Sequence, residues 1–301
     1  MITGAGGFVG AATARAALAA GHTVMALVRR PDAWRLANLS GALSIHVADL
    51  SDDQRISRLL FRLRPDVVIH SAWEGVGGPA RAGDIQFENI RTTLALTDAA
   101  IAAGVSKFVG FGSQAEYGRF DRRIVETDLP QPTMLYGAAK LSACHLVRQR
   151  LQAAGVDFAW LRLFSVFGPE DNPNWLIPSV AAALVRGNVP RCTPGTQKWD
   201  YLHIDDVASA TLATAITDAA TGVFNLSSGQ PVTIRAIVER LRDLAAPGLA
   251  LRFGDVPFGP DQIMHLEGDN TRLRLLTGWD KAIDTLTGLA DVVNAMRVVT
   301  A

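Results

Sequence analysis

The chain has 301 residues, 49% of them hydrophobic and 19% charged, which is enough to bury a large core and excludes a disordered or fibrous protein. Its 29 basic residues balance 29 acidic ones, so the charge gives no support for nucleic acid or an anionic membrane as a partner. No apolar run approaches the roughly 18 residues of a spanning helix, and the N-terminus does not resemble a secretory signal. We therefore expect a cytoplasmic protein.

The cysteines and histidines give no support for a metal or redox site. Cys144 and Cys192 form no CxxC pair, and the six histidines lack the spacing of metal ligands. We expect both cysteines to be small, buried packing residues, and we predict no metal.

Short β-rich runs alternate with longer Ala- and Leu-rich stretches through the first half of the chain. This alternation is typical of a parallel sheet with crossover helices. We predict an α/β fold with a Rossmann-like, doubly wound parallel sheet and a smaller C-terminal substrate-binding lobe. The expected strands lie in HTVMALVRR, ALSIHVADL, PDVVIHSAW, VSKFVGFGS and VDFAWLRLF, and the expected helices in AATARAALAAG, SDDQRISRLLFRLRP, 84–104 and 133–155.

The texture of the sequence changes after Pro169, where further prolines break the chain into short pieces. We expect residues 1–165 to form a dinucleotide-binding domain and 166–301 to form mainly a substrate-binding lobe. Segments near 201–226 are expected to return to the first domain, with VFNLSSG as a strand of its sheet. The tail over 280–301 is predicted to be a closing helix.

The segment GAGGFVG has a glycine at every third position and precedes a predicted helix. A turn without side chains lets a pyrophosphate approach the backbone, and the helix N-terminus offers free N–H groups and a positive dipole end. We interpret the segment as a dinucleotide-binding turn; a packing turn is the alternative. Only Met1, Ile2 and Thr3 precede it. We expect either a chain that begins a few residues late, through trimming or a mistaken start codon, or a genuinely short strand.

The end of the second expected strand bears on the choice of cofactor. A carboxylate there usually binds the ribose hydroxyls of NAD, whereas arginine accommodates the 2′-phosphate of NADP. Val28 stands in the place of the acid and is followed by Arg29 and Arg30. We therefore prefer NADP(H), with NAD(H) as the alternative if both arginines are solvated loop residues. Asp49, at the end of the third strand, is expected either to accept a hydrogen bond from adenine or to cap the next helix.

Tyr136 and Lys140 are four residues apart in LYGAAK, so they share one face of a predicted helix. We expect the Lys140 ammonium and a positive nicotinamide to lower the pKa of the Tyr136 phenol, which can then exchange a proton with a hydroxyl or carbonyl. Ser113 ends the run VSKFVGFGS, where its hydroxyl can hydrogen-bond to the same oxygen. These residues form a candidate Ser-Tyr-Lys set; a surface pair and a turn serine are the alternatives.

At these motifs the chain resembles the extended short-chain dehydrogenase/reductase family, in its branch of NAD(P)-dependent sugar-nucleotide epimerases, dehydratases and reductases. The likeness runs through TGAGGFVG, ADL, GSQAEYG, YGAAK, RLFSVFGP, WDYLHIDDVA and VFNLSSG. It implies that Ser113, Tyr136 and Lys140 are catalytic. It also implies a homodimer joined through the helices over 84–104 and 133–155. The expected cofactor contacts are Gly4, Gly7, Phe8, Val9, Gly10, Arg29, Arg30, Asp49, Leu50, Ala72, Tyr136 and Lys140.

Several positions depart from the family pattern. The acidic pair that the 4,6-dehydratases carry after the catalytic hydroxyl is Gln114 and Ala115 here, and Glu116 is expected to point elsewhere. Dehydration is therefore not predicted. Trp199 stands where an arginine often grips the substrate diphosphate, and Ser165 replaces a common asparagine. The expected substrate contacts are Trp73, Gln114, Ser165, Arg191, Trp199 and Gln262, with Arg252 or Arg186 as further substitutes for the missing arginine.

The leading functional hypothesis is an NADPH-dependent reductase of a keto group on a nucleotide-linked deoxy sugar, with the proton supplied by Tyr136. A C4-epimerase that retains NAD is the alternative, because both chemistries use the same three residues. A non-catalytic NADP-binding scaffold is the second alternative. The implied substrate is a nucleoside diphosphate sugar, and we expect no nucleic-acid or membrane partner.

Overall fold

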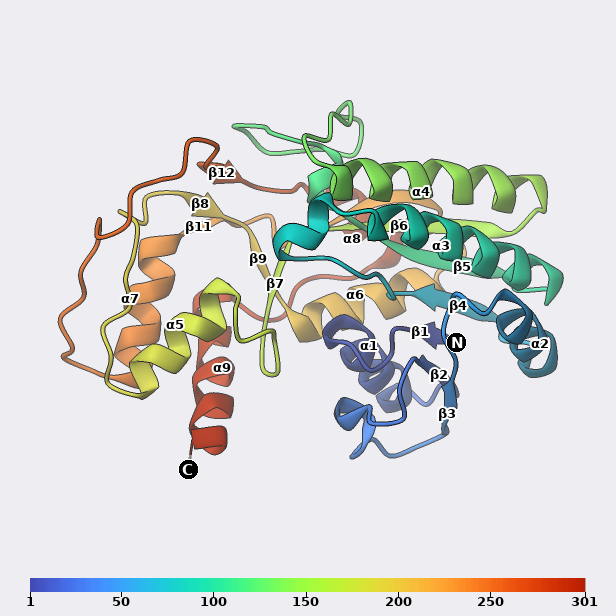
Figure 1. Ribbon diagram of the computed structural model, residues 1–301, viewed down its shortest axis with the longest axis horizontal. Coiled ribbons are helices and arrows are strands. Elements are labelled where there is room, and N and C mark those ends of the chain that lie inside the picture. Colours follow the sequence, from blue (N-terminus) through green and yellow to red (C-terminus); the bar gives the residue numbers. More distant parts are fainter. Residues whose placement is uncertain (301) are drawn as a thin grey trace.

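A seven-stranded parallel sheet with the strand order β10-β6-β5-β4-β1-β2-β3 runs through the molecule (Figure 1). The computed structural model describes residues 1–300. Each of the five runs predicted to be a strand forms a strand of this sheet, so the predicted parallel α/β sheet is confirmed. The strands are β1 (Ile2–Thr3), β2 (Val24–Val28), β3 (Leu43–Val47), β4 (Val67–His70), β5 (Lys107–Ser113), β6 (Asp157–Leu163) and β10 (Gly222–Leu226).

Helices cover both faces of this sheet. On one face α1 (Phe8–Ala19) packs against α6 (Ile204–Ile216). On the other face α3 (Ile85–Ala102) lies between α2 (Asp53–Leu63) and α4 (Leu135–Ala153) (Figure 1). A separate hydrophobic cluster fills each layer. Every residue of β5 is buried, as expected for a strand that is covered by helices on both faces. The doubly wound arrangement is confirmed.

β1 is only two residues long, yet it lies in the interior of the sheet. It pairs in parallel with both β2 and β4. The Met1 α-amino group donates to the Val67 carbonyl at 2.6 Å, and the Met1 carbonyl accepts from Ile69 N at 2.8 Å. Burial lowers the pKa of that amino group to about 6. These contacts on both sides hold the following glycine turn at the carboxyl end of the sheet.

Two glycines in β5 leave room for a tryptophan from the neighbouring strand. A Cβ on Gly110 would lie 2.4 Å from the Trp160 ring, and one on Gly112 would lie 2.2 Å from the Glu116 carboxylate. Trp160 stands on β6 opposite Gly110 and is fully buried. Close packing, and not an unusual backbone angle, therefore requires glycine at both positions.

The C-terminal part of the chain forms a smaller lobe beside the sheet (Figure 1). Its helices α5 (Leu176–Val185), α7 (Ile234–Ala245) and α9 (Thr285–Thr300) share one hydrophobic cluster. Two small sheets, β11-β8-β12 and β7-β9, complete it. Their strands are β7 (Ser165–Phe167), β8 (Lys198–Trp199), β9 (Tyr201–His203), β11 (Val232–Thr233) and β12 (His265–Leu266). The short helices of the chain are η1 (Trp34–Leu36), η2 (Gly78–Ala82), η3 (Gln114–Glu116) and α8 (Thr271–Thr277).

The predicted closing helix corresponds to α9, and residue 301 lies outside the described residues. The predicted strand in VFNLSSG is β10, which pairs with β6 at the edge of the large sheet. The division of the chain at residue 165 stays a prediction. Cys144 and Cys192 are both buried free thiols, as predicted. Across residues 1–300, no helix combines the length and apolarity needed to cross a membrane.

Candidate active site

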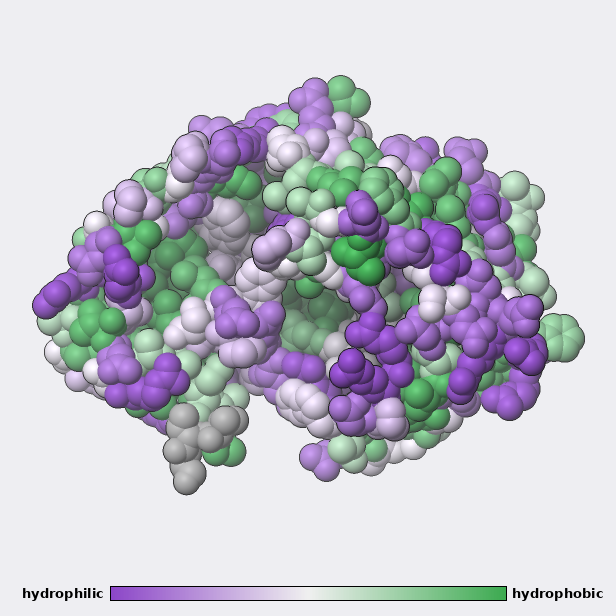
Figure 2. Space-filling model, in the orientation of Figure 1, coloured by the Kyte–Doolittle hydropathy of each residue, from purple (hydrophilic) through white to green (hydrophobic). Residues whose placement is uncertain are grey.

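A cavity of about 700 Å³ opens where β1, β2, β3 and β4 end, the edge at which doubly wound sheets bind their ligands. The face drawn in Figure 2 is hollowed near its middle, with hydrophobic side chains at the floor and hydrophilic ones around the rim. Of the predicted contact residues, the lining includes Gly4, Gly7, Arg29, Arg30, Asp49, Leu50, Ala72 and Trp73. It does not include Phe8, Val9, Gly10, Tyr136 or Lys140.

The glycine turn presents bare backbone at this cavity. Gly4 has a φ of +64°, and a Cβ on it would lie 2.7 Å from Ala72 N. A Cβ on Gly10 would lie 2.3 Å from Gly4 O, so the turn and α1 are in direct contact. Gly7 caps this 12-residue helix without a side-chain hydrogen bond, which leaves the first-turn N–H groups free of a side-chain cap. Turn and helix end together have the shape and polarity that a pyrophosphate requires.

The charged residues after β2 differ in how they are held. Arg29 forms an ion pair with Glu74, a second residue of the cavity lining. Arg30 also lines the cavity and is exposed. The Arg29 guanidinium is therefore already paired with a carboxylate of the protein.

Asp49, after β3, is held by its own turn. Its Oδ1 accepts hydrogen bonds from Ser51 N at 2.9 Å and Ser51 Oγ at 2.7 Å. These bonds lower the pKa of the Asp49 carboxyl. The N-cap of α2 is Asp52, so the alternative in which Asp49 caps that helix is wrong.

Ser113, Tyr136 and Lys140 are brought together at the junction of β5 and α4. The two α4 residues lie one turn apart, and Ser113 is near enough to the Tyr136 phenol to act on its pKa. All three residues are buried. Burial raises the pKa of Tyr136, while the Ser113 hydroxyl and the charge of Arg81 oppose the rise. The lowering of this pKa by Lys140 together with a positive nicotinamide stays a prediction; without the nicotinamide, desolvation dominates, and the cation that acts on the phenol is the Arg81 guanidinium.

The Lys140 ammonium is engaged by a backbone carbonyl and an indole. It donates to Phe111 O at 2.7 Å and lies 3.7 Å from the centroid of the Trp73 ring. Burial lowers the pKa of Lys140 to about 7, against the opposing field of Glu116. The Trp73 Nε1 donates to Gln86 at 2.9 Å, which holds the indole in place. Trp73 therefore links Lys140 to the cavity, because the same residue contacts the ammonium and belongs to the lining.

Glu116 is buried directly behind Ser113. Its Oε1 accepts from Ser113 N at 2.9 Å and Trp160 Nε1 at 3.0 Å, and its Oε2 accepts from Arg162 Nε at 2.7 Å. The predicted orientation away from the dehydratase acid positions is confirmed, but for a different reason. Residues 114–116 form the 3₁₀ turn η3 in place of an alternating strand, and this turn folds Glu116 back toward Ser113.

The family of this chain follows from its match to a known family model. The model of the NAD dependent epimerase/dehydratase family matches residues 1–227 of this chain. The chain belongs to this family. The predicted resemblance to extended short-chain dehydrogenases/reductases is thereby confirmed, and the chain is an enzyme of that type.

Individual members of the epimerase/dehydratase family differ in their chemistry. A UDP-glucose 4-epimerase of Streptomyces lividans is 30% identical over 268 residues, covering 80% of this chain and 79% of that protein. A GDP-6-deoxy-D-mannose reductase of Pseudomonas aeruginosa is 30% identical over 308 residues, covering 97% of this chain and 95% of that protein. The solved structure of MoeE5 in complex with UDP-glucose and NAD has a TM-score of 0.85 at 26% identity, covering 100% of this chain and 99% of that one.

Two positions at which this family member departs from the common pattern are bonded to each other. Trp199 Nε1 donates to Ser165 Oγ at 2.6 Å. The indole stands in the place of the usual arginine and the hydroxyl in the place of the usual asparagine. Because donor and acceptor satisfy one another, this pair leaves no cation at that point of the lobe.

The other predicted substrate contacts are dispersed. The Oε1 of Gln114, on η3, is buried and has no hydrogen-bond partner among the residues that the structure describes. Arg191 is exposed, and its guanidinium donates to the Asp255 carbonyl at 3.4 Å. Gln262 donates to Ile263 O at 2.9 Å. Of the three predicted residues, Gln114 alone adjoins the Ser113 turn.

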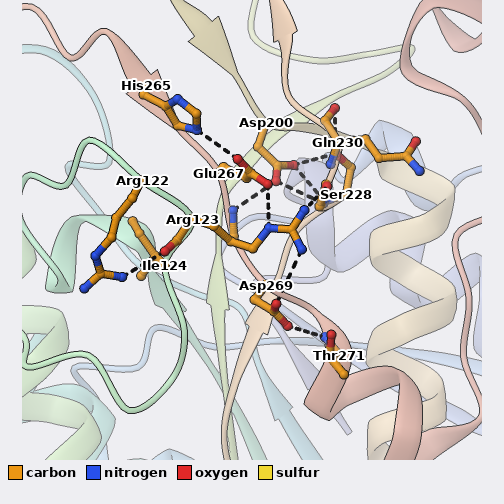
Figure 3. Close-up of polar contacts among 12 residues, drawn as sticks. Arg122, Arg123, Ile124, Asp200, Ser228, Gln230, His265, Glu267, Asp269 and Thr271 are labelled. Carbon is orange, nitrogen blue, oxygen red and sulfur yellow. Dashed lines mark hydrogen bonds and ion pairs between the residues drawn. The ribbon is translucent and has the colours of Figure 1, made fainter.

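Asp200, next to Trp199, ties three segments of the lobe together (Figure 3). Its carboxylate accepts from Ser228 N and Ser228 Oγ, both at 2.7 Å, and from Gly229 N at 3.0 Å and Gly268 N at 3.1 Å. Burial nevertheless raises the pKa of Asp200. The anchored aspartate fixes the backbone that carries Trp199.

Sequence reasoning missed Arg81 and Gln86. Arg81 lies on η2, and its guanidinium carbon is 4.5 Å from the centroid of the Tyr136 ring. Gln86 is fully buried at the start of α3, where its amide donates to the Gly75 and Ala80 carbonyls, both at 3.0 Å. The available signal is one arginine in the Gly-rich segment GVGGPARAG soon after a strand end, a position where binding residues concentrate.

Proposed function

We propose that the chain is an NADPH-dependent reductase of a keto group on a nucleotide-linked deoxy sugar. The observation that carries the proposal is the grouping of Ser113, at the end of β5, with Tyr136 and Lys140, one helical turn apart on α4, all three buried. In this proposal the phenol gives a proton to the developing alkoxide, and the Ser113 hydroxyl shares the charge on that oxygen. The likeness to the Pseudomonas aeruginosa reductase, over nearly the full length of both chains, supports it.

The residues around the cavity fit a nicotinamide dinucleotide. The bare turn at Gly4 and Gly10 and the N-terminus of α1 would hold its pyrophosphate. When bound, the nicotinamide supplies the hydride. Arg29 and Arg30 support a preference for NADP(H), whose 2′-phosphate would compete with Glu74 for Arg29. NAD(H) is the alternative, because the MoeE5 structure contains NAD.

C4-epimerisation with retained NAD is the second candidate. The Streptomyces lividans relative is a UDP-glucose 4-epimerase, and epimerisation uses the same acid–base set. Dehydration is not proposed, because Gln114 and Ala115 offer no acid and the Glu116 carboxylate is held in the core by Arg162.

One assay separates the two candidates. Protein is purified with any cofactor it retains, the cofactor is identified by mass spectrometry, and nicotinamide absorbance is followed with a panel of nucleotide-linked keto sugars. A reductase consumes one NADPH for each product formed, whereas an epimerase leaves the redox state of the bound cofactor unchanged after each cycle. Tyr136→Phe is expected to lower kcat by at least ~10²-fold and to leave cofactor affinity close to that of the parent. Near-normal turnover of this variant would refute the assignment.

We propose a nucleoside diphosphate sugar as the substrate, with its diphosphate charge met by a cation other than residue 199. Arg191 is the first candidate, since it is exposed and the contact of its guanidinium to a carbonyl is long. Arg191→Ala is then expected to raise KM for the nucleotide sugar and leave kcat unchanged. An unchanged KM would assign the diphosphate to another cation.

We also propose a homodimer formed through α3 and α4. These helices expose two large apolar side chains, Phe87 (56%) and Leu146 (45%). Light scattering of the parent is expected to give twice the chain mass, and that of the Phe87→Glu/Leu146→Glu variant the single mass.

We also propose a cytoplasmic location, with which the two unpaired cysteines agree.

A further inference from the structure

The segment η2 sets a guanidinium on the face of the Tyr136 ring. Arg81 Cζ lies 4.5 Å from the ring centroid, within the distance of a cation–π contact. The placement is fixed from below, because the buried Gln86 amide donates to Ala80 O at 3.0 Å. It is fixed from the lobe side as well, since a Cβ on Gly77 would already lie 3.0 Å from the Trp175 ring. The backbone of η2, which carries Arg81, is therefore held in place on both sides.

The charge of Arg81 is not neutralised by a neighbouring carboxylate in the residues that the structure describes. Its Nε is buried and has no hydrogen-bond partner there. A guanidinium paired with an acid would exert a weaker field on a nearby phenol. The field of Arg81 at Tyr136 is consequently that of a full charge in a partly desolvated place.

The other groups that act on the phenol come from three elements. Ser113, at the end of β5, favours the phenolate through its hydroxyl, whereas Glu116, on η3, disfavours the phenolate through its negative charge. Burial of the ring by α4 and its neighbours opposes ionisation most strongly. Lys140, on α4 itself, directs its ammonium at Phe111 O and the Trp73 ring. Arg81 is thus the cation placed to offset burial.

We propose that Arg81 stabilises the phenolate of Tyr136 by stacking its guanidinium on the ring, and so sets the pH range in which this residue exchanges a proton with the substrate. The proposal rests on the proposed function for its catalytic meaning. Its physical content, a lower pKa of the phenol with the guanidinium present, does not.

The test measures ionisation of Tyr136 without any substrate. The chain has three tyrosines, so protein labelled with 3-fluorotyrosine gives three ¹⁹F resonances, and Tyr136→Phe assigns the relevant one. Fluorination lowers the phenol pKa and brings the titration into a range where folding can be monitored at each pH. Arg81→Met removes the charge and keeps the length of the side chain, and Arg81→Lys keeps the charge without the flat stack. Arg64→Met is the matched control, since Arg64 stacks on the Phe61 ring at 5.3 Å on the exposed end of α2.

Arg81→Met is expected to raise the midpoint of the Tyr136 titration by about one pH unit, because the positive charge interacts more favourably with the phenolate than with the neutral phenol. Arg81→Lys should raise it by less, and Arg64→Met should not move it. Equal midpoints in the parent and both Arg81 variants would overturn the proposal, as would a shift shared by the other two tyrosines. If Tyr136→Phe keeps full turnover while Arg81→Met shifts the titration, the proposed function fails and the role of Arg81 on the phenol stands.

Discussion

Two of the arginine–glutamate pairs that join distant parts of the chain show that the burial of an ion pair and the sequence distance it spans are independent. Arg162–Glu116 lies under the Ser113 turn, with side chains 4% and 0% exposed. Arg123–Glu267 lies at the rim of the lobe, with side chains 53% and 13% exposed (Figure 3). The rim pair spans the greater sequence distance, 144 residues against 46. Removal of one member of the rim pair should nevertheless lower the free energy of unfolding by less than removal of one member of the buried pair. The reason is that the rim charges remain hydrated and screened, whereas a buried charge left without its partner is desolvated.

The carboxylate of the buried pair is hydrogen-bonded at both oxygens, and hydrogen bonding of this kind is what makes a buried ion pair tolerable. Both Glu116 oxygens accept hydrogen bonds, and the Arg162 guanidinium also lies 4.3 Å from the centroid of the Tyr117 ring. Loss of one member leaves the other as an unpaired buried charge. The rim pair loses only a solvent-screened attraction when one member is removed.

The largest effect is expected from Glu116→Val. It leaves Arg162 unpaired in the core and should lower the free energy of unfolding by about 3–5 kcal/mol. The double variant Glu116→Val/Arg162→Met should recover much of that loss, because it removes both charges. Urea denaturation with a common m-value measures both. A loss below about 1 kcal/mol in the single variant would contradict the distinction between buried and exposed pairs.

His70 extends the comparison to pH. It lies between Thr3 and Thr93, bonded at 2.8 Å and 2.9 Å, and burial lowers its pKa to about 3 from 6.5. The unfolded chain therefore binds a proton below pH 6.5 that the folded chain does not. Stability should fall as pH drops from 6.5 toward 3, by about 2 kcal/mol at pH 5. His70→Asn should flatten this slope, while His22→Asn, at an exposed position, should keep it. Equal slopes in all three proteins would exclude His70 as the cause.

Arg123→Met should lower the free energy of unfolding by only about 0.2–1 kcal/mol. Because this pair is screened by ions, the difference from the parent should shrink at high salt, whereas the Glu116→Val loss should persist. Parallel urea titrations at low and high sodium chloride concentrations check both statements. A salt-independent loss above about 2 kcal/mol would mean that the rim pair behaves as a buried one.

The smallest effect on stability is expected at the Arg29–Glu74 pair, whose side chains are 53% and 51% exposed. Glu74→Gln should leave stability within about 0.5 kcal/mol of the parent. It frees Arg29 at the cavity rim, so the affinity for NADPH relative to NADH should rise several-fold. Arg30→Ala, at the neighbouring position, should move the ratio the other way. Fluorescence titration with each cofactor gives the ratio, and an unchanged ratio in both variants would remove the basis for the NADP(H) preference.

Much of the fold could be predicted because the signals are local. The runs that form β2 to β6 are short segments rich in apolar residues, and the glycine turn and the spacing of Tyr136 and Lys140 lie within a few consecutive residues. These features depend on residue types and spacings within a few consecutive positions, which can be seen in the sequence itself. The Ser113–Tyr136 contact follows from the strand and helix that carry the two residues.

The contacts that could not be predicted join segments whose spacing carries no period. Lys140 on a backbone carbonyl, Arg81 on the Tyr136 ring and the Trp199–Ser165 bond each depend on how two elements distant in sequence pack together. The bond from Lys140 to the Phe111 carbonyl could not be predicted, because helical proximity to Tyr136 does not say where a long side chain directs its charge. Glu116 was assigned the correct direction from strand alternation, although a 3₁₀ turn produces it.

The two bare positions of β5 and the large ring on β6 form a unit that can change only in concert. A methyl group at Gly110 or Gly112 would expel Trp160 or displace the Glu116 carboxylate, and with it the backbone of Ser113. Substitution histories among close relatives should therefore show these positions exchanging together, a smaller ring appearing wherever either β5 position gains bulk.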